Sequence, residues 1–180
     1  MTKDVICSDN TRTGLIFEAK TDLATFLSKQ PHYSIDADNN VFYDSKKVAQ
    51  IFKKGKFYSV FLKNLKIDWK QYISKKLLPD ESIFVTNSNT LFILKYTHQQ
   101  IGSSVDRKIQ TCDFKKKEYQ KLLAPANIKV EYCYILDDWF RNKKYRDTLD
   151  YIISVNCHYY FSYLPLSEIG LPVPPELVTD

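Results

Sequence analysis

Glycine is scarce in this sequence, and several common signatures are missing with it. Only 4 of the 180 residues are glycine, which leaves little room for a glycine-built phosphate loop. The four cysteines form no C-x-x-C pair, so we expect reduced structural thiols and no zinc site. No stretch approaches the roughly 18 apolar residues of a membrane span, and the N-terminus lacks a secretory pattern. We therefore expect a soluble cytoplasmic protein without a membrane partner.

Apolar residues and lysine are plentiful. The chain is 44% hydrophobic and 14% aromatic, enough to bury a sizeable core. Its length fits one domain over residues 1–180, with a loose proline-rich tail from about residue 172. The net charge of +5 is uneven, because the stretch Lys46 to Lys76 holds ten lysines and one acid, Asp68. Such clustering favours a polyanionic partner, and the alternative is a solvated lysine-rich surface.

The order of apolar periodicities and turn signals predicts a mixed central β-sheet flanked by helices, an α/β (α+β) fold. Strands are expected in two short runs within residues 33–43, then at Ser82–Thr86, Thr90–Tyr96, Asn127–Leu136 and His158–Tyr163. Helices are expected within residues 15–27, then at Lys46–Phe52, Trp69–Leu77, Val105–Leu123, Lys144–Ser154 and Pro165–Leu171.

One part of this pattern suits phosphodiester cleavage. A metal-dependent nuclease needs carboxylates to hold Mg²⁺ and a nearby cation or base. Asp80 precedes the first strand of the predicted hairpin and can be the first acid. Residues 95 and 97 share one face of the second strand, so they are the natural places for a second acid and a lysine.

The sequence resembles a family of PD-(D/E)XK nucleases of the type II restriction endonuclease kind, and the resemblance runs along most of the chain. Long consecutive runs carry it better than the Pro-Asp pair alone. The runs are residues 12–18 (RTGLIFE), 79–80 (PD), 91–93 (LFI), 99–100 (QQ), 102–106 (GSSVD), 110–115 (QTCDFK) and 138–140 (DWF). The resemblance implies a restriction-endonuclease-like fold and Mg²⁺-dependent cleavage of a short sequence in double-stranded DNA by a homodimer. It also implies a cognate DNA methyltransferase in the same system.

The resemblance also implies site residues, and here the chain departs from the family pattern. Asp80 would be a metal ligand, and Glu18 would be a supporting acid and metal ligand on the first helix. Family members would have Glu followed by X-Lys where this chain has Lys95, Tyr96 and Thr97. A lysine at the first of these positions would pair with Asp80 and repel Mg²⁺, and Thr97 cannot replace an ammonium.

Three explanations of this departure stay open. The chain can be an inactivated version of an active enzyme. The register can instead slip, so that Lys95 is the family lysine and Ile93 marks the missing acid. Finally, the chain can be a natural nuclease-like protein that binds DNA without cutting it. A soluble interaction domain with a basic face and no nucleic-acid role is a further hypothesis from a different class.

Polar residues near the predicted catalytic strand are candidates for DNA contact. Glutamine can bond bidentately to an adenine edge, and residues at a helix start can hold phosphate. A polar loop after Trp139 is a third candidate. The expected DNA-binding residues are Gln99, Gln100, Ser103, Ser104, Arg107, Lys108, Arg141, Asn142 and Lys143.

Overall fold

A seven-stranded mixed sheet forms the centre of the computed structural model, which describes residues 16–18, 21–98 and 105–178. Its strands lie in the order β2-β3-β4-β5-β6-β7-β8. Neighbours from β2 to β6 run antiparallel, whereas β6, β7 and β8 run parallel. The strands are β2 (Tyr33–Ile35), β3 (Asn40–Tyr43), β4 (Lys46–Lys53), β5 (Glu81–Val85), β6 (Thr90–Thr97), β7 (Lys129–Leu136) and β8 (His158–Phe161).

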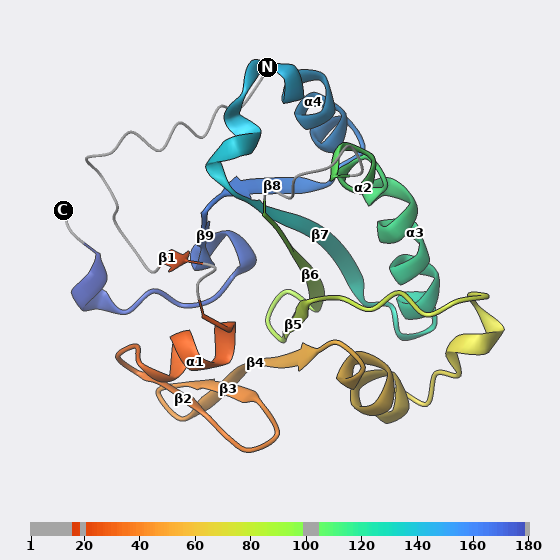
Figure 1. The fold of residues 1–180 in the computed structure, drawn as a ribbon. Coiled ribbons are helices and arrows are strands. Elements are labelled where there is room, and N and C mark those ends of the chain that lie inside the picture. Colours follow the sequence, from red (N-terminus) through yellow and green to blue (C-terminus); the bar gives the residue numbers. More distant parts are fainter. Residues whose placement is uncertain (1–15, 19–20, 99–104, 179–180) are drawn as a thin grey trace.

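Helices cover both faces of this sheet (Figure 1). One face carries α2 (Val105–Ile109), α3 (Cys112–Leu123), α4 (Arg146–Ser154) and the π-helix Phe57–Leu62. The other carries α1 (Leu23–Ser28) and a two-stranded sheet of β1 (Ile16–Glu18) and β9 (Tyr163–Pro165). Single 3-10 turns complete the described chain at Trp69–Gln71, Ala124–Ala126, Asp138–Arg141, Lys143–Tyr145, Leu166–Ile169 and Pro175–Leu177. None of the helices described is long and apolar enough to cross a membrane.

The central strand β6 shows why the molecule has a core on each side of the sheet. Alternate strand residues point to opposite faces. Leu91 and Ile93 pack into the core beneath α3, while Phe92 and Leu94 pack into the core beneath α1. This burial on both sides matches the continuous apolar run that a covered central strand requires.

The mixed sheet flanked by helices is confirmed, and so is the hairpin that carries Asp80. β5 and β6 pair antiparallel around the turn at residues 86–89, where Asn89 adopts φ 49°. The two short strands of residues 33–43, the long strand ending at Leu136 and the helix at α1 are confirmed as well.

The short helix expected at Lys46–Phe52 is wrong, because this segment is the strand β4. Asp44 and Ser45 both have positive φ, 48° and 65°, as a type I′ hairpin turn requires. That turn folds β4 back onto β3, and β5 then pairs along its other edge. The β-prone Val48 and Ile51 are buried in the resulting sheet.

Glu18 does not lie on a first helix as expected. Residues 16–18 form β1, and Glu18 pairs with Tyr163 of β9. The partner is far away in sequence, so local periodicity gave no sign of it.

Four other expected elements differ in extent. The helix expected at Trp69–Leu77 is only the 3-10 turn Trp69–Gln71. The helix expected at Val105–Leu123 is broken between α2 and α3. The strand expected at His158–Tyr163 is interrupted at Ser162, which has φ 59°. The final helix is a 3-10 turn at Leu166–Ile169.

The proline-rich end packs against the domain instead of hanging loose up to residue 178. The hydroxyl of Tyr33 donates to the carbonyl oxygen of Pro172. Nε2 of His32 lies 2.9 Å from a carboxylate oxygen of Glu176. Leu171 is buried in the core beneath α1. This segment therefore closes one side of the domain.

Candidate functional site

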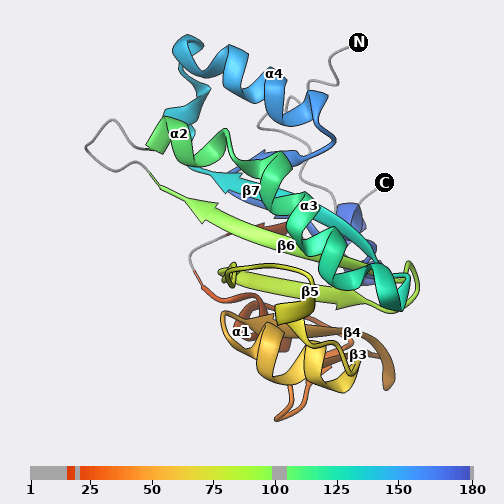
Figure 2. The ribbon, with the colours of Figure 1, turned by 90° about the vertical axis from the view of Figure 1, so that its right-hand side faces the viewer.

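The residues of the candidate site gather at one end of the central sheet. β6 and β7 run parallel, with Thr97 opposite Leu136, so both strands end there. β5 runs the other way and begins at that end, as the arrowheads in Figure 2 show. Asp80, Thr97 and the segment after Leu136 are therefore neighbours. Ligand sites in open sheets commonly lie outside the carboxyl ends of the parallel strands.

Asp80 and Lys95 form an ion pair across the β5–β6 hairpin. Glu81 pairs with Leu94 in antiparallel register, which places Asp80 opposite Lys95. Nζ of Lys95 lies 2.8 Å from Oδ1 of Asp80. The backbone N–H of Tyr96 donates to Oδ2 at 3.1 Å. Both carboxylate oxygens thus have a donor from β6, while the two side chains stay 32% and 36% exposed.

Thr97 and Lys115 lie near this ion pair. Thr97 is two residues beyond Lys95 on β6, so it shares the same face. Lys115 comes from α3, which packs over that face. Burial lowers the pKa of Lys115, and the nearby charge of Lys95 lowers it further, while Asp80 acts in the opposite direction. Among the residues that the structure describes, Asp80 thus lies among at least two ammonium groups, those of Lys95 and Lys115.

The position of Ile93 argues against the slipped register, in which Lys95 is the family lysine and Ile93 marks the missing acid. Its side chain is 1% exposed and packs in the core beneath α3. Ser82, and not Asp80, is its partner on β5. An acid at residue 93 would be buried among apolar side chains. Residue 95 is the position whose side chain reaches Asp80, and residue 97 lies on the same face.

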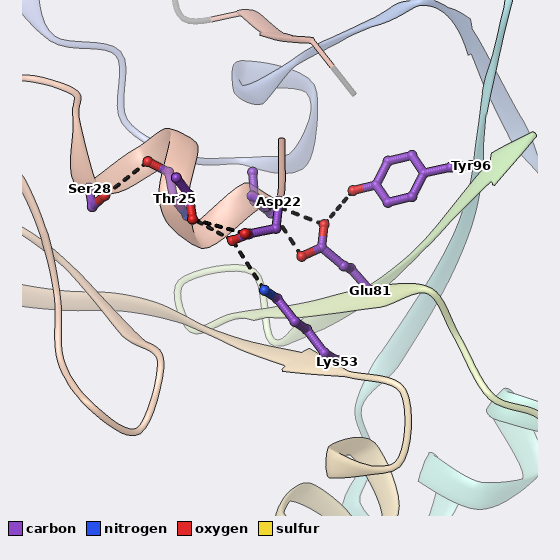
Figure 3. Close-up of polar contacts among 7 residues, drawn as sticks. Asp22, Thr25, Ser28, Lys53, Glu81 and Tyr96 are labelled. Carbon is purple, nitrogen blue, oxygen red and sulfur yellow. Dashed lines mark hydrogen bonds and ion pairs between the residues drawn. The ribbon is translucent and has the colours of Figure 1, made fainter. Parts of the chain in front are cut away.

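A second polar cluster lies beside the first, where α1 meets the ends of β4 and β5 (Figure 3). Asp22 caps α1 by accepting a hydrogen bond from the N–H of Thr25 at 2.9 Å, and Nζ of Lys53 lies 3.1 Å from the same carboxylate oxygen. Burial opposes the ionisation of Asp22, but the bonds from Thr25 and Lys53 outweigh it and lower its pKa. Asp22 is thus held as an anion.

Glu81 is the buried member of this second cluster, with only 4% of its surface exposed. It accepts a hydrogen bond from the hydroxyl of Tyr96 at 2.5 Å and a longer one from the N–H of Leu23 at 3.3 Å. Burial raises the pKa of Glu81 above its usual value, although both hydrogen bonds favour the charged form. Figure 3 shows its carboxylate between α1 and the ring of Tyr96.

The raised pKa of Glu81 predicts a pH-dependent stability. A carboxyl that holds its proton more tightly in the folded chain stabilises the fold fully below its unfolded pKa. That contribution is lost as the pH rises through the higher folded pKa. Glu81→Gln, which stays neutral, should therefore gain stability relative to the parent chain as the pH rises from about 4 to 8.

Urea unfolding of both chains across this pH range measures the difference. Glu168→Gln removes an exposed glutamate and is the matched control, because a substitution at such a surface site should change stability by no more than about 0.5 kcal/mol. A flat difference for Glu81→Gln would contradict a raised folded pKa.

An open pocket of about 420 Å³ is lined by the second cluster and by Asp80 of the first. Tyr96 connects the two clusters, because its N–H donates to Asp80 and its hydroxyl donates to Glu81. Both Asp80 and Tyr96 line the pocket. Its lining residues are Thr21, Asp22, Lys53, Lys54, Asp80, Glu81, Tyr96 and His98. Two of the ten clustered lysines, Lys53 and Lys54, thus lie at the site itself.

The segment after β7 carries three of the expected DNA contacts to the same end of the sheet. Nε of Arg141 lies 2.8 Å from Asp138, and its guanidinium is 4.2 Å from the ring centre of Phe161. The side chain of Asn142 caps the next 3-10 turn through the N–H of Lys144. Lys143 is exposed. Arg141 would have to leave its present partners before it could reach a base.

The remaining expected contacts divide into two groups. Arg107 and Lys108 lie on α2 and are exposed. Gln99, Gln100, Ser103 and Ser104 lie outside the described residues. The side chain of Glu18 is likewise not described, so its expected role beside Asp80 stays a prediction.

Several residues of this site were not expected from the sequence. Asp22, Lys53, Glu81 and Tyr96 form the second cluster. By sequence alone, Lys115 to Lys117 are either DNA-backbone contacts or a solvated helix face, and the structure brings Lys115 to the first cluster. Glu81 and Tyr96 could have been found from the hairpin register, which places them on one face. Asp22 and Lys53 could not, because β4 and α1 meet only in the folded chain.

Comparison with known proteins finds no matching family model, no similar curated protein and no similar solved structure. Within residues 16–18, 21–98 and 105–178, no group of three His, Cys, Asp or Glu side chains has the arrangement of a metal site.

Proposed function

We propose that this chain is a nuclease-type domain of the type II restriction endonuclease kind, which binds double-stranded DNA at the end of the sheet that carries Asp80. The observation that supports this most is the pairing of Asp80 with residue 95 across neighbouring strands, with residue 97 on the same face. In the nuclease family that the sequence resembles, an acid faces a second acid and a lysine spaced two apart on the neighbouring strand, and the acids hold the metal ion. In this proposal the fold is restriction-endonuclease-like, and a homodimer would match a palindromic target.

Mg²⁺ is the cofactor that the resemblance implies, but the side chains described at this site do not fit it. Lys95 holds an ammonium 2.8 Å from Asp80, where a divalent cation would have to bind. The other oxygen of Asp80 already accepts from the N–H of Tyr96. Mg²⁺ prefers several oxygen ligands, and a neighbouring cation repels it. We therefore expect weak or no cleavage by this exact chain.

The Lys95–Asp80 ion pair favours a second candidate, a nuclease-fold protein that binds DNA or assists another protein without cutting. Both candidates need binding to duplex DNA, and they differ only in chemistry. Several features support binding: the lysine-rich stretch, the exposed Lys143 beside the site, and Arg107 and Lys108 on α2. Positive charge on one face releases counterions from DNA and gives salt-sensitive affinity.

A titration of a labelled duplex at several salt concentrations tests binding. If the chain contacts about six phosphates or more, its affinity should fall at least ~10³-fold between about 50 and 200 mM salt. Arg141→Gln combined with Lys143→Gln should weaken binding and flatten this salt dependence. The matched control is Lys121→Gln with Lys129→Gln, because both lysines are exposed at the other end of the sheet. Absence of salt-sensitive binding would leave only an interaction domain unrelated to DNA.

A further inference from the structure

The Asp80 face carries an excess of positive charge where a metal-dependent nuclease would carry negative charge. Within residues 21–98 and 107–178, Asp80 is the carboxylate that acts on both Lys95 and Lys115, and it already pairs with Lys95. Lys115 lies within electrostatic reach of both groups. These three groups, one acid and two lysines, together carry a net positive charge when all are ionised. A site with this balance attracts an anion and repels a divalent cation.

Donors remain free on this face after the internal contacts are counted. An ammonium has three N–H donors, and Lys95 gives one of them to Asp80. Among the residues that the structure describes, the ammonium of Lys115 and the hydroxyl of Thr97 have no hydrogen-bond partner. Lys95 is 36% exposed, so a ligand can reach it from solvent. These donors suit the unesterified oxygens of a phosphodiester.

We propose that Lys95, Lys115 and Thr97 form a metal-independent clamp for one backbone phosphate of duplex DNA. Asp80 orients Lys95 through the 2.8 Å ion pair. Lys95 and Lys115 supply charge, and Thr97 donates a hydroxyl hydrogen bond. The inference rests on the proposed function, because the phosphate belongs to the DNA that the domain binds. The inference goes beyond the proposed function, because it assigns the Asp80 face to binding of a DNA phosphate and not to binding of a metal ion.

Binding measurements in EDTA and in Mg²⁺ at matched ionic strength test the clamp. The parent chain should bind the duplex equally well in both buffers. Lys95→Gln should lower the affinity by about tenfold near 0.1 M salt and reduce the slope of log K against log salt by about 1. Lys129→Gln, at the far end of β7, removes the same charge and should leave both quantities close to the parent values. Asp80→Asn should raise the affinity severalfold in EDTA, because it releases Lys95 and removes the competing acid.

The outcomes separate this inference from the proposed function. If the parent binds DNA but Lys95→Gln keeps the same affinity and salt slope, the clamp is wrong and DNA binding stands. The same conclusion follows if Asp80→Asn binds more weakly in EDTA, or if parent binding requires Mg²⁺. If the parent shows no duplex binding at all, the proposed function fails and the clamp fails with it.

Discussion

Introducing Lys95→Glu and Thr97→Lys together should give the chain Mg²⁺-dependent cleavage of duplex DNA. The first change replaces the cation beside Asp80 with a carboxylate, so two acids face each other across the hairpin. The second places an ammonium two residues further along the same face of β6. A single electrostatic group in an active site is worth about 10²- to 10³-fold in rate, so the pair should raise cleavage by at least that factor.

Plasmid nicking and linearisation, followed over time with Mg²⁺ and with EDTA, measure this change. A second readout is thermal stability, because two neighbouring carboxylates repel each other until a cation binds between them. Mg²⁺ should therefore raise the Tm of the double variant and leave that of the parent chain unchanged. Adding Asp80→Ala to the double variant should remove both effects.

The single variants show which group limits the parent chain. Lys95→Glu alone should gain the Mg²⁺-dependent rise in Tm but cleave less than the double variant. Thr97→Lys alone adds another cation near Lys95, so it should neither cleave nor respond to Mg²⁺. A double variant that folds and binds DNA but leaves plasmid uncut with Mg²⁺ would contradict the nuclease proposal. The protein would then be a DNA-binding domain without the catalytic arrangement of a nuclease.

The part of the site that could be predicted from sequence is the part built by local pairing. The turn cluster at residues 87–89 fixes a hairpin between β5 and β6, and an antiparallel hairpin has a definite register. That register alone brings residue 95 to Asp80. Strand alternation placed residues 95 and 97 on one face, the family resemblance placed residue 95 beside Asp80, and the structure contains the ion pair expected there.

Elements whose partners are distant in sequence could not be predicted in this way. β1 exists because residues 16–18 pair with β9, which lies across most of the chain. β4 looked helical from its local spacing, but two neighbouring strands hold it extended. The ion pair of Asp22 with Lys53 joins the start of α1 to the end of β4, so it forms only once β4 is a strand of the sheet. The second polar cluster was therefore beyond local sequence reasoning.

Aromatic side chains of the core hold the segment that leads into Asp80. Truncating one of them should therefore lower the stability of the fold strongly. The hydroxyls of Tyr58 and Tyr119 both donate to the carbonyl oxygen of Leu77 at 2.9 Å, three residues before Asp80. Phe57 lies next to both rings, at 5.0 Å and 5.4 Å between centroids, and is fully buried. Phe57 thus packs the π-helix against α3, next to the segment that precedes Asp80.

Phe57→Ala should destabilise the fold by about 3–5 kcal/mol, because the lost apolar contacts are compounded by the cavity left behind. For a chain of this size the Tm should fall by about 6–20 °C. Phe114→Ala is the matched control, since Phe114 is 62% exposed on α3 and its truncation should cost no more than about 0.5 kcal/mol. Urea unfolding and calorimetry of the three chains measure both quantities. Equal losses for the two variants would mean that Phe57 does not lie in the core and does not support the segment before Asp80.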